Sequence, residues 1–330
     1  MNLSFNPFVL YGITDYKQFK EFPFLESKSI QQLKNMVGNQ IRDNFRFPDR
    51  LLLLGVPGIG KSTSLYYIYD MLSEAGCNVF LFDKFFIDEE DFNNQAGVRL
   101  SEISKKPVYI LVDFPDTINQ FNFKKFLDYC WNAMKGPNSD NISFVFACNI
   151  SHYNRSLSLS EVLNKFLRFR LDNMSEEESN WLIKSRLKMA GSDNYFEEGV
   201  YEIIFKYSRG IPRNIICASK LLVDEYINKD LVNVQEANSI LKEEYIDKII
   251  NDREENPKRK LLYKSIMKII LNDFKGTSTN QTELTKAIKT KLNIGTNRSM
   301  GFLSDLCKFG LLEFYKGGRN NSEKIWGVKL

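Results

Sequence analysis

The apolar residues between positions 50 and 173 form short runs that alternate with stretches of helical periodicity. Such alternation is typical of β-α-β units, in which the strands are parallel. Four of the runs are almost continuously apolar, as expected for strands that are covered on both faces. We therefore predict a doubly wound α/β fold with a five-stranded parallel sheet, whose strands lie at residues 51–54, 78–82, 108–112, 142–148 and 168–172.

The pattern changes at Ser175, after which apolar residues recur at helical spacing. Ser175 and Glu178 have the spacing of a capping box, which marks the start of a helix. Gly210 and Pro212 interrupt the helical pattern, and it resumes at Arg213. This region, residues 174–250, predicts a small helical domain.

A polar stretch at residues 251–260 predicts a hinge or a linker between helices. Beyond it we predict helices at 261–273, 281–292 and 297–309, then strands at 311–315 and 324–328, joined by a Gly- and Asn-containing turn. Three helices and a β-hairpin are typical of a winged helix-turn-helix. The predicted domains are an N-terminal segment (1–35), an α/β core (36–173), a helical domain (174–250) and a C-terminal winged helix (258–330).

Composition excludes several classes of protein and site. The 330 residues are 43% hydrophobic, which suffices for two or three domains with cores of their own. The chain has neither a long uncharged apolar stretch nor a signal-peptide pattern, so we expect a cytoplasmic protein with no membrane partner. Five cysteines without a Cys-x-x-Cys pair and a single histidine argue against a disulfide framework, a zinc site and a Ser-His-Asp triad. We expect the cysteines to be buried thiols.

Positive charge is concentrated at the C-terminal end. Residues 251–330 contain 16 lysines and arginines and 8 acidic residues, a surplus of 8, whereas the whole chain has a net charge of +4. The remaining residues therefore carry a net charge of −4. A basic region on an acidic body is expected where that region binds a polyanion, although a solvated charged surface explains it equally well.

A complete phosphate-binding loop follows the first predicted strand. The sequence from Gly55 to Ser62 is Gly-Val-Pro-Gly-Ile-Gly-Lys-Ser, and its glycines let backbone N–H groups close around a phosphate at a helix N-terminus. Lys61 is expected to reach the β- and γ-phosphates, and the Ser62 hydroxyl to coordinate Mg²⁺. We predict ATP or ADP with Mg²⁺ as ligands, bound by Gly55, Pro57, Gly58, Ile59, Gly60, Lys61, Ser62 and Thr63.

The third predicted strand ends at Asp113, which is the expected second magnesium anchor, acting through water. Hydrolysing enzymes of this kind usually have a Glu at the next position, where this chain has Phe114. Either Asp116 or another acidic residue polarises the attacking water, or hydrolysis is slow and the nucleotide acts as a switch. Asn149 ends the fourth strand and is a candidate for holding the attacking water, or else it caps the next turn.

The order of these motifs resembles that of AAA+ ATPases. The resemblance rests on the P-loop, Asp113, Asn149, the segment 168–171 and Gly210-Ile211-Pro212-Arg213. It implies that Arg213 is a lid arginine that senses the γ-phosphate. It also implies that Arg168, just before the fifth strand, acts on the nucleotide of a neighbouring subunit, and that residues 22–28 pack near the adenine. Homo-oligomers or other AAA+ subunits are therefore expected partners, although Arg168 as a plain surface charge remains the alternative.

With a winged helix after the lid, the chain resembles origin-recognition-type initiators and transposition-regulator ATPases. In a winged helix the third helix enters the DNA major groove and the wing contacts the backbone. Double-stranded DNA is thus an expected partner, through Asn297, Arg298, Ser299, Lys316 and Arg319. The main hypothesis is a DNA-associated ATPase, an initiator, loader or regulator. The alternative is a STAND-type signalling or defence ATPase whose winged helix binds protein.

Overall fold

The computed structural model describes residues 5–8, 16–22, 24–42, 50–82, 89–96, 107–114, 120–133, 135, 142–150, 153, 161–192, 194–227, 231–274, 277–278, 281–309, 311–317 and 323–328. The chain divides into two compact units, Met1–Val232 and Asn233–Leu330. The elements of the first unit are α1 (Tyr16–Glu21), α2 (Lys28–Arg42), β1 (Leu51–Gly55), α3 (Lys61–Glu74), β2 (Asn78–Phe82), α4 (Glu89–Ala96), β3 (Val108–Asp113), α5 (Gln120–Ala133), β4 (Ile142–Asn149), a 3-10 helix (Leu163–Lys165), β5 (Leu167–Arg170), α7 (Glu176–Met189), α8 (Glu198–Ser208) and α9 (Pro212–Tyr226).

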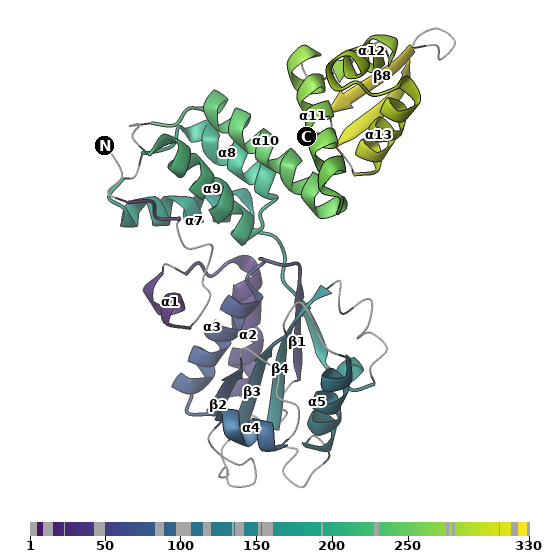
Figure 1. Ribbon diagram of the computed structural model, residues 1–330. Helices are drawn as coiled ribbons and strands as arrows, with labels where there is room; N and C mark the ends of the chain where they lie inside the picture. The colour runs from purple at the N-terminus through teal and green to yellow at the C-terminus, as the bar shows by residue number, and fades with distance from the viewer. Residues whose placement is uncertain are drawn as a thin grey trace. The chain divides into compact units, whose positions relative to one another are not determined.

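The first unit contains a five-stranded parallel sheet in the order β2-β3-β4-β1-β5 (Figure 1). The predicted α/β fold class is confirmed, and each predicted strand is present within two residues of its expected bounds. β1, β3 and β4 are buried almost throughout, because helices cover both faces of the sheet. β2 and β5 are the edges, and β5 is mostly exposed.

Side chains alternate between the two faces of the sheet and fill two separate cores. Leu51 and Leu53 of β1 pack with residues of α2 and α3. Leu52 and Leu54 pack on the opposite face, with Phe92 of α4 and residues of α5. The continuous apolar run of β1 therefore contributes side chains to both cores. This packing fixes the position of the loop that follows the strand.

Helices α7, α8 and α9 follow the sheet in the first unit. α7 begins with the predicted capping box, in which the Ser175 hydroxyl accepts a hydrogen bond from the Glu178 N–H and the Glu178 carboxylate accepts one from the Ser175 N–H. Gly210, between α8 and α9, has φ +69°, and a Cβ there would lie 2.3 Å from the Met174 carbonyl oxygen. The break in the helical pattern therefore marks a close backbone approach that only glycine permits.

The second unit begins one helix earlier than the predicted winged-helix domain. Its elements are α10 (Val234–Arg253), α11 (Pro257–Asp273), β6 (Thr277–Ser278), α12 (Gln281–Leu292), α13 (Thr296–Lys308), β7 (Leu312–Gly317) and β8 (Glu323–Val328). Ile246 and Ile250 of α10 belong to the same hydrophobic core as α11, α12 and α13. The strands form an antiparallel sheet in the order β6-β8-β7, of which β6 was not predicted. The domain boundaries inferred from the sequence stay predictions.

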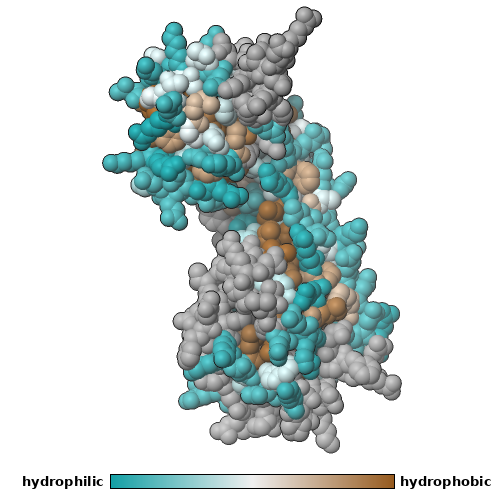
Figure 2. Space-filling model, turned by 90° about the vertical axis from the view of Figure 1, so that its right-hand side faces the viewer, coloured by the Kyte–Doolittle hydropathy of each residue, from teal (hydrophilic) through white to brown (hydrophobic). Residues whose placement is uncertain are grey.

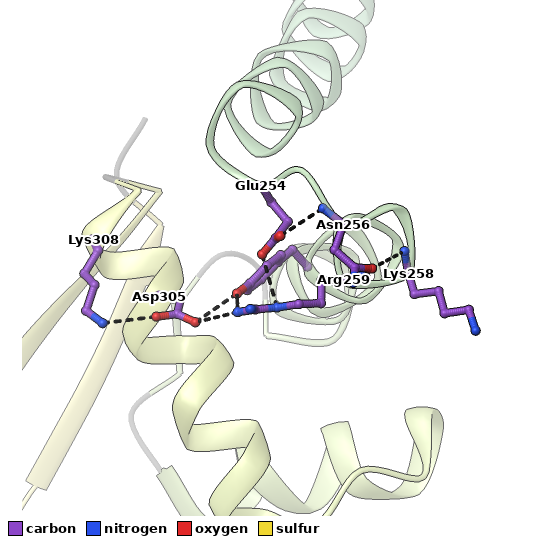
Figure 3. Close-up of polar contacts among 7 residues, drawn as sticks. Glu254, Asn256, Lys258, Arg259, Asp305 and Lys308 are labelled. Carbon is purple, nitrogen blue, oxygen red and sulfur yellow. Dashed lines mark hydrogen bonds and ion pairs between the residues drawn. The ribbon is translucent and has the colours of Figure 1, made fainter.

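The predicted linker is a tight corner between α10 and α11 at residues 254–256 (Figure 3). The Asn256 side chain accepts hydrogen bonds from the N–H groups of Lys258 and Arg259 and so caps α11. The Arg259 guanidinium pairs with Glu254 at 3.1 Å and with Asp305 of α13 at 3.1 Å. The polar residues of this stretch therefore serve a helix cap and an ion-pair network.

Hydrophilic residues predominate on the face of the molecule in Figure 2, where hydrophobic residues form small groups. Among the described residues, no helix has both the length and the apolar composition needed to cross a membrane. The described residues also contain no group of three or more His, Cys, Asp or Glu side chains that could hold a metal ion together. All five cysteines are free thiols. Only Cys130 and Cys148 are buried, however, so the expectation of five buried thiols was too broad.

Candidate nucleotide-binding site

The register of the sheet brings three predicted site residues to the same edge. Gly55 at the end of β1 is paired with Asn149 at the end of β4, and Asp113 at the end of β3 is paired with Ala147. The carboxyl ends of parallel strands are where open α/β sheets bind ligands. The predicted nucleotide-binding residues occupy the loop from β1 to α3 (Gly55, Pro57, Gly58, Ile59 and Gly60) and the first turn of α3 (Lys61, Ser62 and Thr63).

The loop has a backbone path that requires its glycines. Gly58 and Gly60 have φ angles of +81° and +103°, in the left-handed region that other residues rarely adopt. A Cβ on Gly55 would lie 2.5 Å from a methyl group of Ile59. Gly60 is the N-cap of α3 and has no side chain to satisfy the first N–H groups of the helix. Those groups are suited to bind a phosphate.

The Lys61 ammonium lies over the loop. Its Nζ donates hydrogen bonds to the carbonyl oxygens of Val56, at 3.1 Å, and Gly55, at 3.4 Å. An ammonium forms stronger hydrogen bonds with anionic phosphate oxygens than with neutral carbonyl oxygens, so Lys61 is suited to bind a phosphate at this loop.

The Ser62 hydroxyl donates a hydrogen bond to an oxygen of the Asp113 carboxylate. α3 presents the hydroxyl and β3 presents the carboxylate, so the two oxygens meet beside the loop. Mg²⁺ prefers oxygen ligands and is commonly bound through one or two protein groups together with phosphates and water. The oxygen pair fits such an ion, which would supply positive charge to the phosphate oxygens.

Phe114 follows Asp113 and is a core residue. Its exposed fraction is 5%, its ring packs against Phe126 at 5.6 Å and Phe146 at 5.1 Å, and its N–H donates to the Ala147 carbonyl. The position after Asp113 thus points into the hydrophobic core beneath α5 and holds no catalytic carboxylate. The predicted substitute, Asp116, lies outside the described residues.

Helix α9 begins against the phosphate-binding loop. The Arg213 N–H donates a hydrogen bond of 3.2 Å to the Gly58 carbonyl. A Cβ on Gly58 would lie 2.6 Å from the Cβ of Arg213, so Gly58 also permits this close approach. Pro212 occupies the first position of α9, where its missing N–H costs nothing. The lid arginine and the phosphate loop are therefore direct neighbours.

Comparison of structures identifies the fold. Thermotoga maritima RuvB, as a single-residue mutant, superposes with a TM-score of 0.50 at 19% sequence identity, over 94% of each chain. Cdc6p from Pyrobaculum aerophilum gives a TM-score of 0.50 at 12% identity, over 100% of this chain and 95% of that one. The chain has the fold of the AAA+ P-loop ATPases. The resemblance found in the sequence is thereby confirmed, although no protein-family model and no curated protein matches this sequence.

Two further polar residues were predicted from the AAA+ motif order. Asn149 is 9% exposed at the end of β4, beside the start of the phosphate loop in the sheet register. Arg168 is the second residue of β5, which begins at Leu167, one residue before the predicted start of this strand. Its guanidinium donates to the Asn164 side chain at 2.8 Å and lies 5.2 Å from the centre of the Tyr153 ring. Arg168 is exposed on an edge strand, and its action on a neighbouring subunit stays a prediction.

The segment expected near the adenine base leads into α2. Phe24 stacks on Tyr67 of α3 at 5.1 Å, and the Lys28 N–H at the start of α2 donates to the Glu178 carboxylate at 2.7 Å. This segment therefore contacts both the sheet domain and the lid of the AAA+ fold. Packing of this segment near an adenine base stays a prediction, and the sequence gave no sign of the bond to Glu178.

The predicted DNA-binding residues lie at the start of α13 and in the β7–β8 hairpin. Asn297 and Arg298 are exposed, and the Arg298 guanidinium lies 5.7 Å from the centre of the Phe302 ring. Ser299 is wrongly placed in this set, because it is fully buried and its hydroxyl donates to the Gly295 carbonyl at 3.2 Å. Lys316 belongs to β7, and Arg319 lies outside the described residues.

Proposed function

We propose that this protein is an ATP-binding AAA+ switch in which nucleotide controls assembly on double-stranded DNA, as in an initiator, a loader or a transposition-type regulator. The observation that carries the nucleotide-binding step is the meeting of Ser62 with Asp113 beside a loop that Arg213 contacts directly. This arrangement supports a site that holds phosphates and Mg²⁺ and links their presence to the lid.

Each residue contributes a separate interaction to this switch. The N–H groups at the start of α3 and Lys61 bind the phosphates. Ser62 and Asp113 hold the metal ion. Arg213 extends from α9 toward the γ-phosphate, so that ATP holds the lid on the loop more firmly than ADP does. Lid position therefore depends on which nucleotide is bound.

Hydrolysis by this site is proposed to be slow. The position that carries the water-polarising Glu in faster enzymes is Phe114, whose ring lies in the core against Phe126 and Phe146. The preceding residue, Asp113, has a carboxylate, but this group accepts a hydrogen bond from Ser62 and is proposed to hold the metal ion. Asn149 can orient a water molecule but cannot accept its proton. The ATP-bound state is therefore long-lived, which suits a switch.

The second unit is proposed to be a winged helix that binds DNA. This assignment is supported by the antiparallel sheet β6-β8-β7 and by the order of its elements, which is α11, β6, α12, α13, β7 and β8. The exposed Asn297 and Arg298 at the start of α13 face solvent, as a groove-binding helix requires. The basic surplus of residues 251–330 supports a polyanionic partner. Association with further AAA+ subunits through β5 and Arg168 is part of the proposal.

Nucleotide binding is tested with a fluorescent ATP analogue and with hydrolysis measured at saturating ATP. Wild type should bind the analogue with Mg²⁺ and hydrolyse ATP slowly. Lys61→Ala should bind about 10- to 100-fold more weakly, because a hydrogen bond to a charged group contributes about 1.5–3 kcal/mol. The matched control is Lys188→Ala, an exposed lysine of α7, which should bind as wild type does. Equal affinity of wild type and Lys61→Ala contradicts the proposed site.

DNA binding is tested by duplex titration over a series of salt concentrations. Arg298→Ala with Arg319→Ala should weaken binding and reduce the salt dependence by about one unit of slope for each phosphate contact that is lost. Lys188→Ala with Lys248→Ala, at exposed lysines of α7 and α10, is the control that removes the same net charge. A wild-type protein that binds no duplex at low salt contradicts the DNA hypothesis and favours a protein partner of the signalling type.

A further inference from the structure

Two lysines from separate segments of the first unit lie against the same tryptophan ring. Trp131 belongs to α5, which covers one face of the sheet (Figure 1), and its side chain is half-buried against the hydrophobic core beneath this helix. The ammonium of Lys135, just beyond α5, and that of Lys165, at the end of the 3-10 helix, each lie 4.2 Å from the centre of the Trp131 ring. Both lysines are exposed. We refer to Trp131, Lys135 and Lys165 as the tryptophan surface.

The two ammoniums of the tryptophan surface are close enough to repel each other. Because both lie 4.2 Å from one ring centre, they are at most twice that distance apart. This separation is comparable with the Debye length of about 8 Å at physiological ionic strength. Among the described residues, neither Lys135 nor Lys165 forms an ion pair or a hydrogen bond with an acidic side chain. An anion that accepts hydrogen bonds from both ammoniums would therefore relieve the repulsion.

The surroundings of the tryptophan surface are basic, although the residues before position 251 carry a net charge of −4. α5, Lys135 and residues 161–170 together contain six basic and two acidic residues. Two of the basic residues are Arg168 and Arg170 of β5, which are exposed. They lie on the α5 side of the sheet, because their register partners in β1 pack in the core beneath α5. This side of the first unit therefore attracts anions.

We propose that the tryptophan surface binds phosphates of a DNA backbone and is a second DNA contact, separate from the winged helix. A DNA strand carries phosphates at short intervals, so both ammoniums can bind one phosphate or two neighbouring ones. The Trp131 ring attracts both ammoniums and holds them in position for this contact. DNA is favoured over an acidic protein because residues 251–330 are basic as well, and one polyanion is attracted by both regions. The inference rests on the proposed DNA binding.

Lys135→Ala with Lys165→Ala tests the tryptophan surface in the full chain, by duplex titration over a series of salt concentrations. The salt dependence should fall by about two units of slope, one for each phosphate contact that is lost. At about 0.1 M salt, affinity for the duplex should fall about 10- to 100-fold. Lys135→Arg with Lys165→Arg keeps both charges and should retain most of the slope.

Two controls show that the loss is local. Lys188→Ala with Lys248→Ala removes the same net charge at exposed lysines of α7 and α10 and should change the slope far less. The Lys135→Ala, Lys165→Ala variant should also bind the fluorescent ATP analogue as wild type does. Lys165 precedes β5, so it lies at the edge of the sheet where the strands begin, whereas the phosphate loop follows the end of β1.

Acetylation of individual lysines, quantified by mass spectrometry, is the direct readout of the contact. Bound duplex should protect Lys135 and Lys165 of the wild type, whereas Lys188 should react equally fast with and without duplex. Inorganic phosphate at the same phosphate concentration should protect neither Lys135 nor Lys165, because it lacks the many linked charges of DNA. Equal protection by inorganic phosphate and by duplex would replace the DNA contact with a site for a small anion.

An unchanged salt slope in Lys135→Ala with Lys165→Ala, or no protection of these lysines while duplex is bound, overturns the tryptophan surface and leaves the winged-helix proposal intact. Weaker self-association of the variant with unchanged duplex binding also overturns it, because the surface then contacts protein. A wild-type protein that binds no duplex at low salt overturns the proposed DNA function itself. The outcomes therefore distinguish failure of this contact from failure of the proposed function.

Discussion

The Ser62 hydroxyl donates a hydrogen bond to the Asp113 carboxylate across 51 positions of the sequence. This single contact joins the helix that follows the phosphate loop to the end of a neighbouring strand. It brings together the two side-chain oxygens that are proposed to hold Mg²⁺, that of Asp113 through water, and each residue can be tested separately.

Asp113→Asn tests the metal role of this pair. The asparagine keeps an oxygen that accepts from Ser62 and removes the negative charge that attracts Mg²⁺. We expect the variant to bind the ATP analogue equally in Mg²⁺ and in EDTA, whereas wild type binds more tightly in Mg²⁺. Binding is measured by fluorescence titration. The same gain from Mg²⁺ in both proteins would show that Asp113 holds no metal ion.

Arg213→Ala tests whether the lid distinguishes ATP from ADP. Because Arg213 is proposed to contact the γ-phosphate, its loss should weaken ATP about 10- to 100-fold and leave ADP affinity nearly unchanged. Competition of ATP and ADP against the same fluorescent analogue gives both values. Lys188→Ala in the same lid serves as the control. Equal weakening of ATP and ADP would assign Arg213 to general lid packing.

Phe114→Glu tests why the usual carboxylate is missing. The new side chain would enter an apolar core against Phe126 and Phe146, where an ionised group is strongly disfavoured. We expect a loss of stability of about 3 kcal/mol or more and no gain in ATP turnover. Phe114→Leu, which keeps an apolar side chain, should cost far less. A stable Phe114→Glu protein with faster turnover would place this residue at the γ-phosphate.

The pattern of apolar residues was enough to predict the sheet, because short, nearly continuous apolar runs are typical of parallel strands that are buried on both faces. In the run Leu51 to Leu54 every leucine lies in a core, two on each face of the sheet. The phosphate loop was equally predictable, since Gly58 and Gly60 need positive φ and Lys61 follows them in a fixed spacing. A site can be predicted in this way where its residues lie within a few positions of one another in the sequence.

Contacts between distant segments were not predictable. The sequence gives no sign that Asn6 bonds to Asp224 or that Lys28 bonds to Glu178, because each residue is an ordinary polar residue in its own surroundings. Ser299 was assigned to a DNA surface from helix position alone, and its burial depends on packing against neighbouring helices. The place of α10 in the second unit was likewise not predictable, because Ile246 and Ile250 pack in a core whose other residues come later in the sequence.

Asp305→Asn tests the ion-pair network at the α10–α11 corner. Burial would raise the pKa of Asp305, but hydrogen bonds from Tyr263 and Lys308 outweigh it and hold this pKa below its usual value of 3.8. A carboxyl group with a lowered folded-state pKa stabilises the fold above its unfolded pKa, and the stabilisation is lost as the pH falls through the folded pKa. The variant should therefore be about 1 kcal/mol less stable than wild type at about pH 7.

This difference should begin to shrink as the pH falls below about 3.8 and should vanish once the pH passes the lowered pKa of folded Asp305, where the wild-type carboxyl group is protonated as well. Chemical denaturation at about pH 7 and at about pH 3 measures both values. Asp247→Asn alters a carboxylate that is more exposed than that of Asp305 and pairs with Lys264 alone among the described residues, so it should cost less at about pH 7. A difference that persists unchanged in acid would mean that the carboxylate charge of Asp305 has no part in the network.

We propose that ATP bound at the P-loop controls association with DNA. The most direct measurement is the affinity for a labelled duplex at low salt with ATP, with ADP and without nucleotide, for wild type and Lys61→Ala. We expect ATP to strengthen duplex binding by wild type relative to ADP and to have no effect on duplex binding by Lys61→Ala. Duplex binding by wild type that is the same in all three nucleotide conditions would contradict it.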